Sequence, residues 1–340
     1  MGPTLLLDKS SFQALKSCEM HKLTNYFQWN IVDILLEEIR CDFLKETKTA
    51  SSRNEASILA DKYSPAMDSM QNVNYRELFI ANLYGHEVVM DCIPIVASTT
   101  TNTLDDGQRI ALIDKTIFSE MIRRWQKGEF DIQDKVFANI WKIVKDSSKA
   151  DSCILFLQVN HIIIPESKSI DELRIIVDEL LRNPKMQHVF LDMFLSYEDI
   201  DQTEKYNIKE RLKRCPYSLS KVAPYAFYCL KVFVLFLGAY KFGLLLEKKT
   251  DDQIDLEYLF YLPFCHVFSS NDKFHATLAP PLMGKDQIFL PGEDLKKGIQ
   301  EIESLPVHIE TMNAKCFPIP PMPKESIIRE VWLKTRWLYD

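Results

Sequence analysis

Residues 251–278, DDQIDLEYLFYLPFCHVFSSNDKFHATL, constrain the fold of this chain more than any other stretch. The segment begins as an acidic amphipathic helix, breaks at Pro263 and continues as a short apolar strand over residues 265–269. In open parallel α/β sheets, ligands and catalytic groups gather beyond the carboxyl ends of the strands. We therefore expect a functional site at the polar residues that follow this strand: Ser270, Asn271 and Asp272.

Three more acidic residues can reach the same crevice. Asp255 lies seventeen residues before Asp272, about the length of one short helix and one strand, so the fold can bring the two together. Residues 3–7, PTLLL, predict a buried strand that ends at Asp8. Glu38 lies at the margin of the apolar stripe of a helix expected over residues 30–44. The pattern predicts a cluster of carboxylates.

Such a cluster is unfavourable by itself, because the carboxylates repel one another and lose hydration when they are buried. A hard divalent cation neutralises them, and near a phosphodiester it also activates water and stabilises the leaving oxygen. We therefore expect Mg²⁺ or Mn²⁺ as the cofactor. The residues expected to bind it and to act in catalysis are Asp8, Glu38, Asp255 and Asp272.

Three dispersed motifs, LLLDKSS, LLEEIRCDFLK and IDLEYLFYLPFCHVFSSNDKFH, resemble the acidic motifs of PIN-like nucleases. The resemblance implies a three-layer α/β/α fold around a parallel sheet, and metal-dependent hydrolysis of RNA in preference to DNA. Matched by position, Asp8, Glu38, Asp255 and Asp272 take the acidic places of that family, and Ser270 takes its small hydroxyl. Either Glu37 or Asp42 could fill the place of Glu38 instead.

The resemblance covers residues 1–48 and 216–300, which we expect to form a discontinuous nuclease core. Residues 49–215 predict a mainly α-helical insertion that acts as a lid, a specificity module or a dimer surface. Within it, residues 153–164, CILFLQVNHIII, fit either a strand or a buried helix. Residues 301–340 predict a proline-rich linker followed by a C-terminal helix.

The most apolar segment, residues 221–246, approaches the length of a membrane span. Lys231 and Lys241 interrupt it, and a lysine near the centre of a bilayer is costly. We expect instead a buried helix that covers the sheet, with the lysine stems on apolar surface and their ammonium groups in water. No membrane partner is therefore expected.

A net charge of −7 excludes a protein that coats nucleic acid with its whole surface, because such binding relies on lysine and arginine. Local basic patches are still allowed. The densest contains Lys209, and we expect its other members, Arg211, Lys213 and Arg214, to contact the phosphate backbone. The remaining substrate contacts are expected beside the acids, from Ser270, Asn271, Lys273 and His275.

Eight cysteines are scattered without a C-x-x-C pair, which indicates reduced thiols in a cytoplasmic protein, and the N-terminus does not have the pattern of a signal peptide.

Two other functions stay open. A phosphohydrolase of the haloacid dehalogenase type also begins with a strand ending in Asp, but Ser10 stands where its second Asp is required. The other is a degenerate PIN-like scaffold that binds nucleic acid or protein. The PIN-like resemblance also suggests a toxin or defence effector that a protein partner inhibits. The expected protein partner is such a regulatory protein or a second copy of the chain.

Overall fold

The computed structural model describes residues 2–44, 54–63, 70–96, 100–103, 109–112, 116–145, 149–215, 217–245, 252–303 and 322–335. Its strands are β1 (Thr4–Leu7), β2 (Gln28–Ile31), β3 (Met70–Gln71), β4 (Thr100–Thr103), β5 (Arg109–Leu112), β6 (Val267–Ser270) and β7 (Ile288–Pro291). Its α-helices are α1 (Lys9–Ala14), α2 (Ser17–Tyr26), α3 (Asp33–Cys41), α4 (Glu55–Lys62), α5 (Tyr75–Leu83), α6 (Thr116–Gln126), α7 (Ile132–Lys145), α8 (Lys149–Val159), α9 (Ile170–Leu180), α10 (Pro184–Tyr197), α11 (Gln202–Lys213), α12 (Leu219–Val222), α13 (Pro224–Phe242), α14 (Asp252–Leu259), α15 (Lys273–Leu278), α16 (Gly292–Glu303) and α17 (Ile327–Lys334). Short 3-10 helices are η1 (Asp42–Leu44), η2 (Leu262–Phe264) and η3 (Pro280–Leu282).

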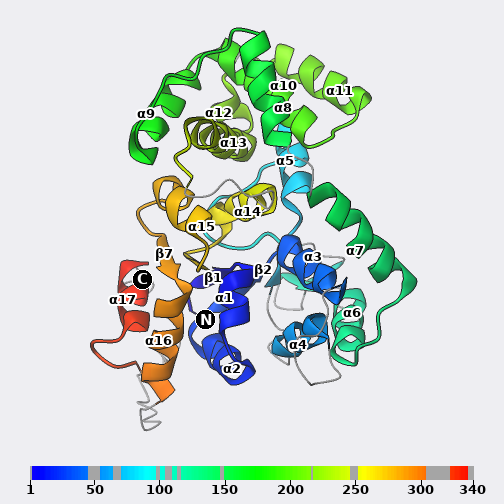
Figure 1. Ribbon diagram of the computed structural model, residues 1–340, viewed down its shortest axis with the longest axis vertical. Helices are drawn as coiled ribbons and strands as arrows, with labels where there is room; N and C mark the ends of the chain where they lie inside the picture. The colour runs from blue at the N-terminus through cyan, green and yellow to red at the C-terminus, as the bar shows by residue number, and fades with distance from the viewer. Residues whose placement is uncertain are drawn as a thin grey trace.

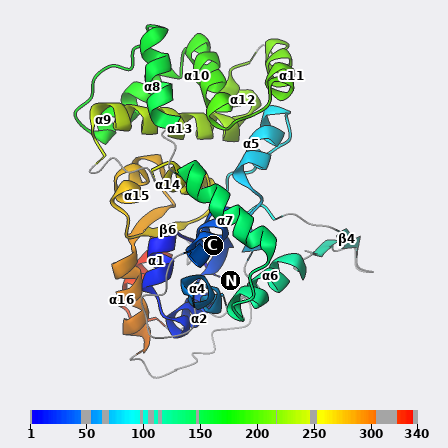
Figure 2. The same cartoon turned by 45° about the vertical axis from the view of Figure 1, so that its right-hand side comes forward.

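One parallel sheet organises the lower half of the molecule, with the strand order β3-β2-β1-β6-β7. The predicted α/β class is confirmed. The apolar β1 is central and all its residues are buried, which is why a run of leucines forms a strand here rather than an alternating pattern. A separate antiparallel hairpin, β4 and β5, projects from the body (Figure 2).

Helices cover both faces of the sheet and make three layers (Figure 1). On one face, Ser269 of β6 meets Ser11 of α1 with 3.3 Å between the hydroxyl oxygens. On the other face, the Phe268 ring lies 6.4 Å from Tyr258 of α14 and 5.0 Å from His275 of α15, measured between ring centroids. Because side chains alternate along a strand, each residue at the end of β1 or β6 is assigned to one of these two faces.

A second group of helices, α8 to α13, lies above the sheet half in Figure 1. Its centre is α13, which packs on α5, α8, α9, α10 and α14. Phe194 of α10 contacts Phe233 of α13 at 4.8 Å and Phe260 after α14 at 5.5 Å, between ring centroids. The apolar core therefore continues from the sheet half into the helical half.

The predicted division into a core and an insertion needs correction. Met70 of β3 lies within residues 49–215, yet it pairs with Asn30 of β2 and forms the edge of the sheet. Tyr63, also from that segment, packs its ring 4.9 Å from the Phe12 ring of α1. The predicted insertion therefore supplies part of the α/β core, as well as the helical half.

Two boundary predictions also change. The helix expected over residues 30–44 begins at Asp33, because Asn30 and Ile31 belong to the parallel strand β2. Residues 153–164, open between strand and helix, continue α8 up to Val159. The proline-rich segment at 316–321 lies outside the described residues.

The apolar α13 is the one helix among the described residues that is long and apolar enough to cross a membrane. In the structure 67% of its most apolar window is buried by protein, as expected for the core helix of a water-soluble protein. Lys231 extends to the surface and pairs with Asp178 at 2.7 Å. The seven cysteines in the described segments are free thiols.

Candidate active site

Asp8 stands at the carboxyl end of the central strand and caps α1, with its carboxylate accepting a hydrogen bond from the Ser11 amide at 2.8 Å. The register that pairs Leu6 with Phe268 brings Asp8 beside Ser270, whose hydroxyl donates to Asp8 Oδ2 at 2.6 Å. Ser10 Oγ lies 2.7 Å from the same oxygen. The chain thus fixes this carboxylate on the sheet face covered by α14 and α15.

His275 of α15 provides the positive charge of the site. Its Nε2 lies 2.9 Å from the backbone carbonyl of Asp255, which can only accept, so Nε2 must donate. Its Nδ1 lies 2.9 Å from Ser270 Oγ, whose own proton goes to Asp8, so Nδ1 donates as well. Both nitrogens carry protons, which makes the buried ring an imidazolium.

The ionisation of the pair agrees with this assignment. Burial by itself lowers the pKa of His275, but the hydrogen bond to Asp8 and the negative charges of Asp255 and Asp8 raise it to about 9. Burial raises the pKa of Asp8, but the hydrogen bond and charge of His275 together with the Ser270 hydroxyl outweigh burial, so the pKa lies below 3.8. Asp8 is therefore ionised at neutral pH and His275 is its counter-ion.

Asp255 of α14 is a partly exposed carboxyl in an acidic neighbourhood. Burial raises its pKa to about 8, and the negative charges of Glu38, Asp272 and Asp8 add to this effect, while His275 opposes it. Among the described residues, no hydrogen-bond donor reaches its side chain. The group therefore holds a proton at neutral pH unless another positive charge approaches.

Glu38 is the carboxylate of α3 that faces this cluster. Its Oε2 accepts a hydrogen bond from the Tyr258 hydroxyl at 2.6 Å. Burial raises the pKa of Glu38, the charge of Lys9 and the Tyr258 hydroxyl lower it, and Asp8 raises it further. The alternative acid Asp42 is instead paired with Lys9 at 2.7 Å. Of the three acids left open by the sequence, Glu38 lies beside Asp8 and Asp255.

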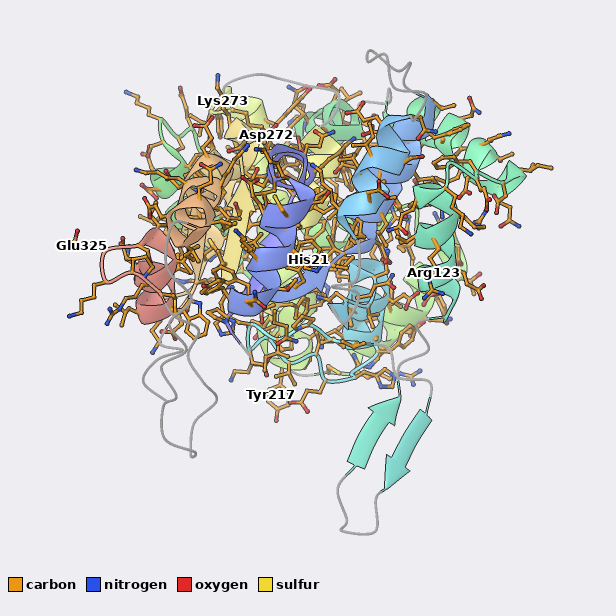
Figure 3. All side chains as sticks on the ribbon, turned by 90° about the horizontal axis from the view of Figure 1, so that it is seen from below. His21, Arg123, Tyr217, Asp272, Lys273 and Glu325 are labelled. Carbon is orange, nitrogen blue, oxygen red and sulfur yellow. The ribbon has the colours of Figure 1, made fainter. Side chains whose placement is uncertain are left out.

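Asp272 completes the group at the start of α15, where its side chain caps the helix by accepting from the Phe274 amide at 2.7 Å. Its own amide donates to Ser270 Oγ at 2.9 Å, which links it to Asp8 through one hydroxyl. Figure 3 shows Asp272 and the exposed Lys273 at neighbouring positions near the surface. The structure thus brings the four predicted acids into one neighbourhood.

The predicted substrate contacts are distributed unevenly. Lys273 and Asn271 are exposed beside the acids, and the Asn271 amide donates to Ser10 Oγ at 2.9 Å. Ser270 is buried, and its hydroxyl donates a hydrogen bond to Asp8 rather than facing the solvent. His275 is also buried, with both nitrogens occupied, so its place is against Asp8 rather than against a phosphate at the surface.

The basic patch on α11 does not lie at the acidic cluster. In Figure 1, α11 lies at the top of the helical half, away from β1 and α15. Arg211 donates to the backbone carbonyl of Leu83, and Lys213 pairs with Glu210 at 2.7 Å. Arg211, Lys213 and Arg214 therefore do not accompany the four acids, and their contact with a phosphate backbone stays a prediction.

The chemistry of the four acids suits a hard cation, because such ions prefer carboxylate oxygens and Glu38, Asp255 and Asp272 are all partly exposed. Within the described part of the chain, no three histidine, cysteine or acidic side chains already surround one point as a metal-binding group. Asp8 and Asp255 now share the charge of His275 instead. Side chains would have to rotate toward a cation for direct coordination.

Several residues that support the site were not predicted. Tyr258 lies one helical turn after Asp255, and that spacing is the only sequence signal for its contact with Glu38. Lys9, which follows Asp8, ties α1 to Asp42 and to the Glu38 carbonyl. Both contacts depend on tertiary packing.

Comparisons with protein-family models, with curated proteins and with solved structures give no match for this chain.

Proposed function

We propose that this chain is a metal-dependent nuclease of PIN-like type that hydrolyses phosphodiester bonds, with RNA as its preferred substrate, in the cytoplasm. The observation that carries the proposal is that the charges of Asp8, Glu38 and Asp272 all act on Asp255 near the carboxyl edge of a parallel sheet. Asp8 and Glu38 come from the N-terminal part of the chain and Asp255 and Asp272 from residues 251–278. The negative charge of Asp8 raises the pKa of Glu38, and those of Glu38, Asp272 and Asp8 raise the pKa of Asp255. Such a concentration of negative charge is stable only with a compensating cation or proton.

The residues divide the work in this proposal. Asp8, Glu38, Asp255 and Asp272 would hold Mg²⁺ or Mn²⁺, which supplies an activated water and stabilises the leaving oxygen when bound. Ser270 and Ser10 orient the Asp8 carboxylate through their hydroxyls. Lys273 and Asn271 are exposed next to Asp272 and can contact the substrate.

The test is cleavage of a labelled single-stranded RNA in the presence and absence of Mn²⁺. We expect Mn²⁺-dependent cleavage by the unaltered chain. The cleavage rate should fall by at least about 100-fold in Asp272→Asn, because a neutral amide replaces one of the carboxylates that would bind the metal. Lys297→Met, a change on the exposed side of α16, serves as the matched control and should cleave normally. Cleavage that survives EDTA or the Asp272→Asn change would contradict the proposal.

A second candidate rests on a different observation. The Asp8 carboxylate accepts hydrogen bonds from Ser10, Ser11 and Ser270, and His275 compensates its charge. It therefore needs no cation to be stable. A PIN-like scaffold that only binds nucleic acid or protein would have this feature. RNA binding without cleavage at any divalent ion concentration would favour this candidate, whereas phosphate release from small monoesters would favour the dehalogenase-type reaction.

A further inference from the structure

Arg76, in the first turn of α5, is an arginine oriented by a buried acid from the helical half. Its Nε donates to Oε2 of Glu198, just after α10, at 2.6 Å. The Glu198 side chain is 3% exposed, whereas the Arg76 side chain is 44% exposed. The Tyr75 hydroxyl donates to the same oxygen at 2.8 Å and holds the acid in place. The Nε side of the guanidinium is thus fixed in protein, while the Arg76 side chain as a whole is partly exposed.

The contacts leave the outer part of the guanidinium available. The Nε hydrogen bonds to Glu198 and also lies 3.3 Å from the Tyr75 hydroxyl. Among the described residues, no contact involves the two terminal amino groups of Arg76. These amino groups form the fork that binds two phosphate oxygens at once.

Arg76 follows the carboxyl edge of the sheet at which Asp8 also stands. Its charge acts on Glu37 of α3 and Glu257 of α14, the two helices that also carry Glu38 and Asp255. The chain reaches Arg76 from β3, whose carboxyl end lies on the same edge of the sheet as Asp8. A nucleic acid strand that crosses this edge from α15 toward β3 would pass the acids first and Arg76 next.

We propose that Arg76, held by Glu198, is a phosphate-binding subsite for a single-stranded RNA, one or more nucleotides from the bond that is cut. The inference rests on the proposed function and gives the helical half a role, because Glu198 reaches the substrate path only through Arg76. Arg76 would thus bind phosphate at the sheet edge where Asp8 stands, whereas Arg211 and Lys213 on α11 hydrogen bond to Leu83 and pair with Glu210, respectively.

The experiment separates binding from cleavage by using Asp272→Asn as the background. Binding of a labelled 12-nucleotide RNA is followed by fluorescence anisotropy at several salt concentrations, with Arg76→Met, Arg76→Lys and Arg174→Met compared. Arg174 is the matched control, because it is similarly exposed, at 39%, and pairs with Asp178 on α9 in the helical half. Circular dichroism and thermal unfolding verify that each variant is folded.

We expect Arg76→Met to weaken RNA binding about 10- to 100-fold, as for the loss of one charged hydrogen-bonding group. The slope of log K against log salt should fall by about 0.7, which corresponds to one phosphate contact on a single strand. Arg76→Lys should recover part of the affinity, and Arg174→Met should change neither quantity. Equal affinities and slopes for Arg76→Met and Arg174→Met would overturn the subsite.

Cleavage measured in the otherwise unaltered chain distinguishes the two proposals. If that chain cleaves RNA and Arg76→Met raises KM for the 12-nucleotide RNA but not for a dinucleotide, both proposals are supported. If cleavage is seen with an unchanged KM, the subsite is wrong and the nuclease stands. If RNA binds through Arg76 but is never cut, the nuclease is wrong and the subsite stands. Should Arg76→Met unfold, Glu198→Gln replaces it, and an unchanged salt slope in Glu198→Gln counts against the subsite.

Discussion

At the scale of single residues, the site consists of charges that depend on one another. His275 is buried and positively charged because Asp8 and Asp255 surround it, and Asp8 is ionised because His275 and three hydrogen-bond donors face it. Asp255 receives less of this compensation and keeps its proton. The carboxyl groups are thus stable without a cation. A bound cation would lower the pKa of Asp255, so that metal binding is coupled to the release of its proton.

The raised pKa of Asp255 predicts a pH-dependent stability. In the folded chain the pKa is about 8, against 3.8 ordinarily, so the stability that comes from the protonated carboxyl is full below about pH 4 and is lost as the pH rises through about 8. Asp255→Asn removes this loss. In EDTA, its Tm relative to the unaltered chain should increase by a few degrees between pH 5 and pH 8.

His275 is charged in the folded chain across this range, because its pKa is raised from 6.5 to about 9. The stability that it contributes is lost as the pH rises from about 6.5 toward 9, but both chains carry His275, so the comparison of their Tm values is between chains that share this loss. The change in Tm is followed by circular dichroism at each pH. If the two Tm curves run parallel from pH 5 to pH 8, Asp255 titrates normally and the acidic neighbourhood is wrong.

Tyr258 should matter for metal dependence rather than for folding. Tyr258→Phe keeps the ring that packs on His275 but removes the hydroxyl that orients Glu38. We expect the Mn²⁺ concentration for half-maximal cleavage to rise about tenfold or more, as for other residues that support metal ligands. Tyr228→Phe is the control, because its hydroxyl donates to the Leu259 carbonyl at 2.8 Å, away from the acids. A similar Mn²⁺ requirement in both variants would exclude this role for Tyr258.

At the scale of elements, two helix starts and the end of a strand meet behind the acids. Asn271, between β6 and α15, accepts from the Glu293 amide of α16 at 3.0 Å and thereby caps that helix from another segment. Gly292 begins α16 at this point, and a Cβ there would lie 2.3 Å from Ser11 Oγ and 2.7 Å from Asn271 Nδ2. The absence of a side chain allows α16 to approach the loop that carries Asp272.

Gly292→Ala should therefore affect both stability and cleavage. We expect a loss of about 1–3 kcal/mol in the free energy of unfolding, as for other overpacked positions, and slower cleavage because Asn271 and Asp272 are displaced together. Urea denaturation and the RNA assay measure the two effects. A Cβ at Gly298 on the same helix would lie 3.1 Å from Ile328 Cγ1 and 3.5 Å from Ile327 Cβ, which is less close than at Gly292, so Gly298→Ala should change stability by less. Equal stability of the two variants would mean that the contact at Gly292 is not required.

At the scale of the whole molecule, the α/β half and the helical half share one core. From β3 the chain continues into α5, which packs on α13 of the helical half, and α13 also packs on α14. Phe194 lies at the junction, where it contacts the rings of Phe79, Phe233 and Phe260. The two halves should therefore unfold together.

Tryptophan fluorescence offers a test, because none of the five tryptophans lies in residues 149–245. Phe194→Ala, a change in the helical half, should cost about 3–5 kcal/mol, and fluorescence and circular dichroism should report the same lowered midpoint in urea. Phe156→Ala on α8 is the control, since that ring is 43% exposed and should contribute little. Separate midpoints for the two probes in Phe194→Ala would show two independent domains.

The sequence by itself determined the elements that carry the acids. A run of leucines followed by Asp8, and an apolar strand followed by Ser270 and Asp272, predict strand ends because a short apolar run is followed directly by polar residues. The parallel α/β class follows from the same local pattern. These signals are short-range, so they can be identified without coordinates.

Only the tertiary structure decided which side chains meet. The choice of Glu38, the pairing of Lys9 with Asp42, and the role of His275 as counter-ion depend on contacts between residues 33 to 267 positions apart. The strand β3 is just two residues long and has no detectable period, so its place at the sheet edge, and that of Arg76 beyond it, could not be predicted. Long-range packing sets these distances, and no local pattern of residues encodes them.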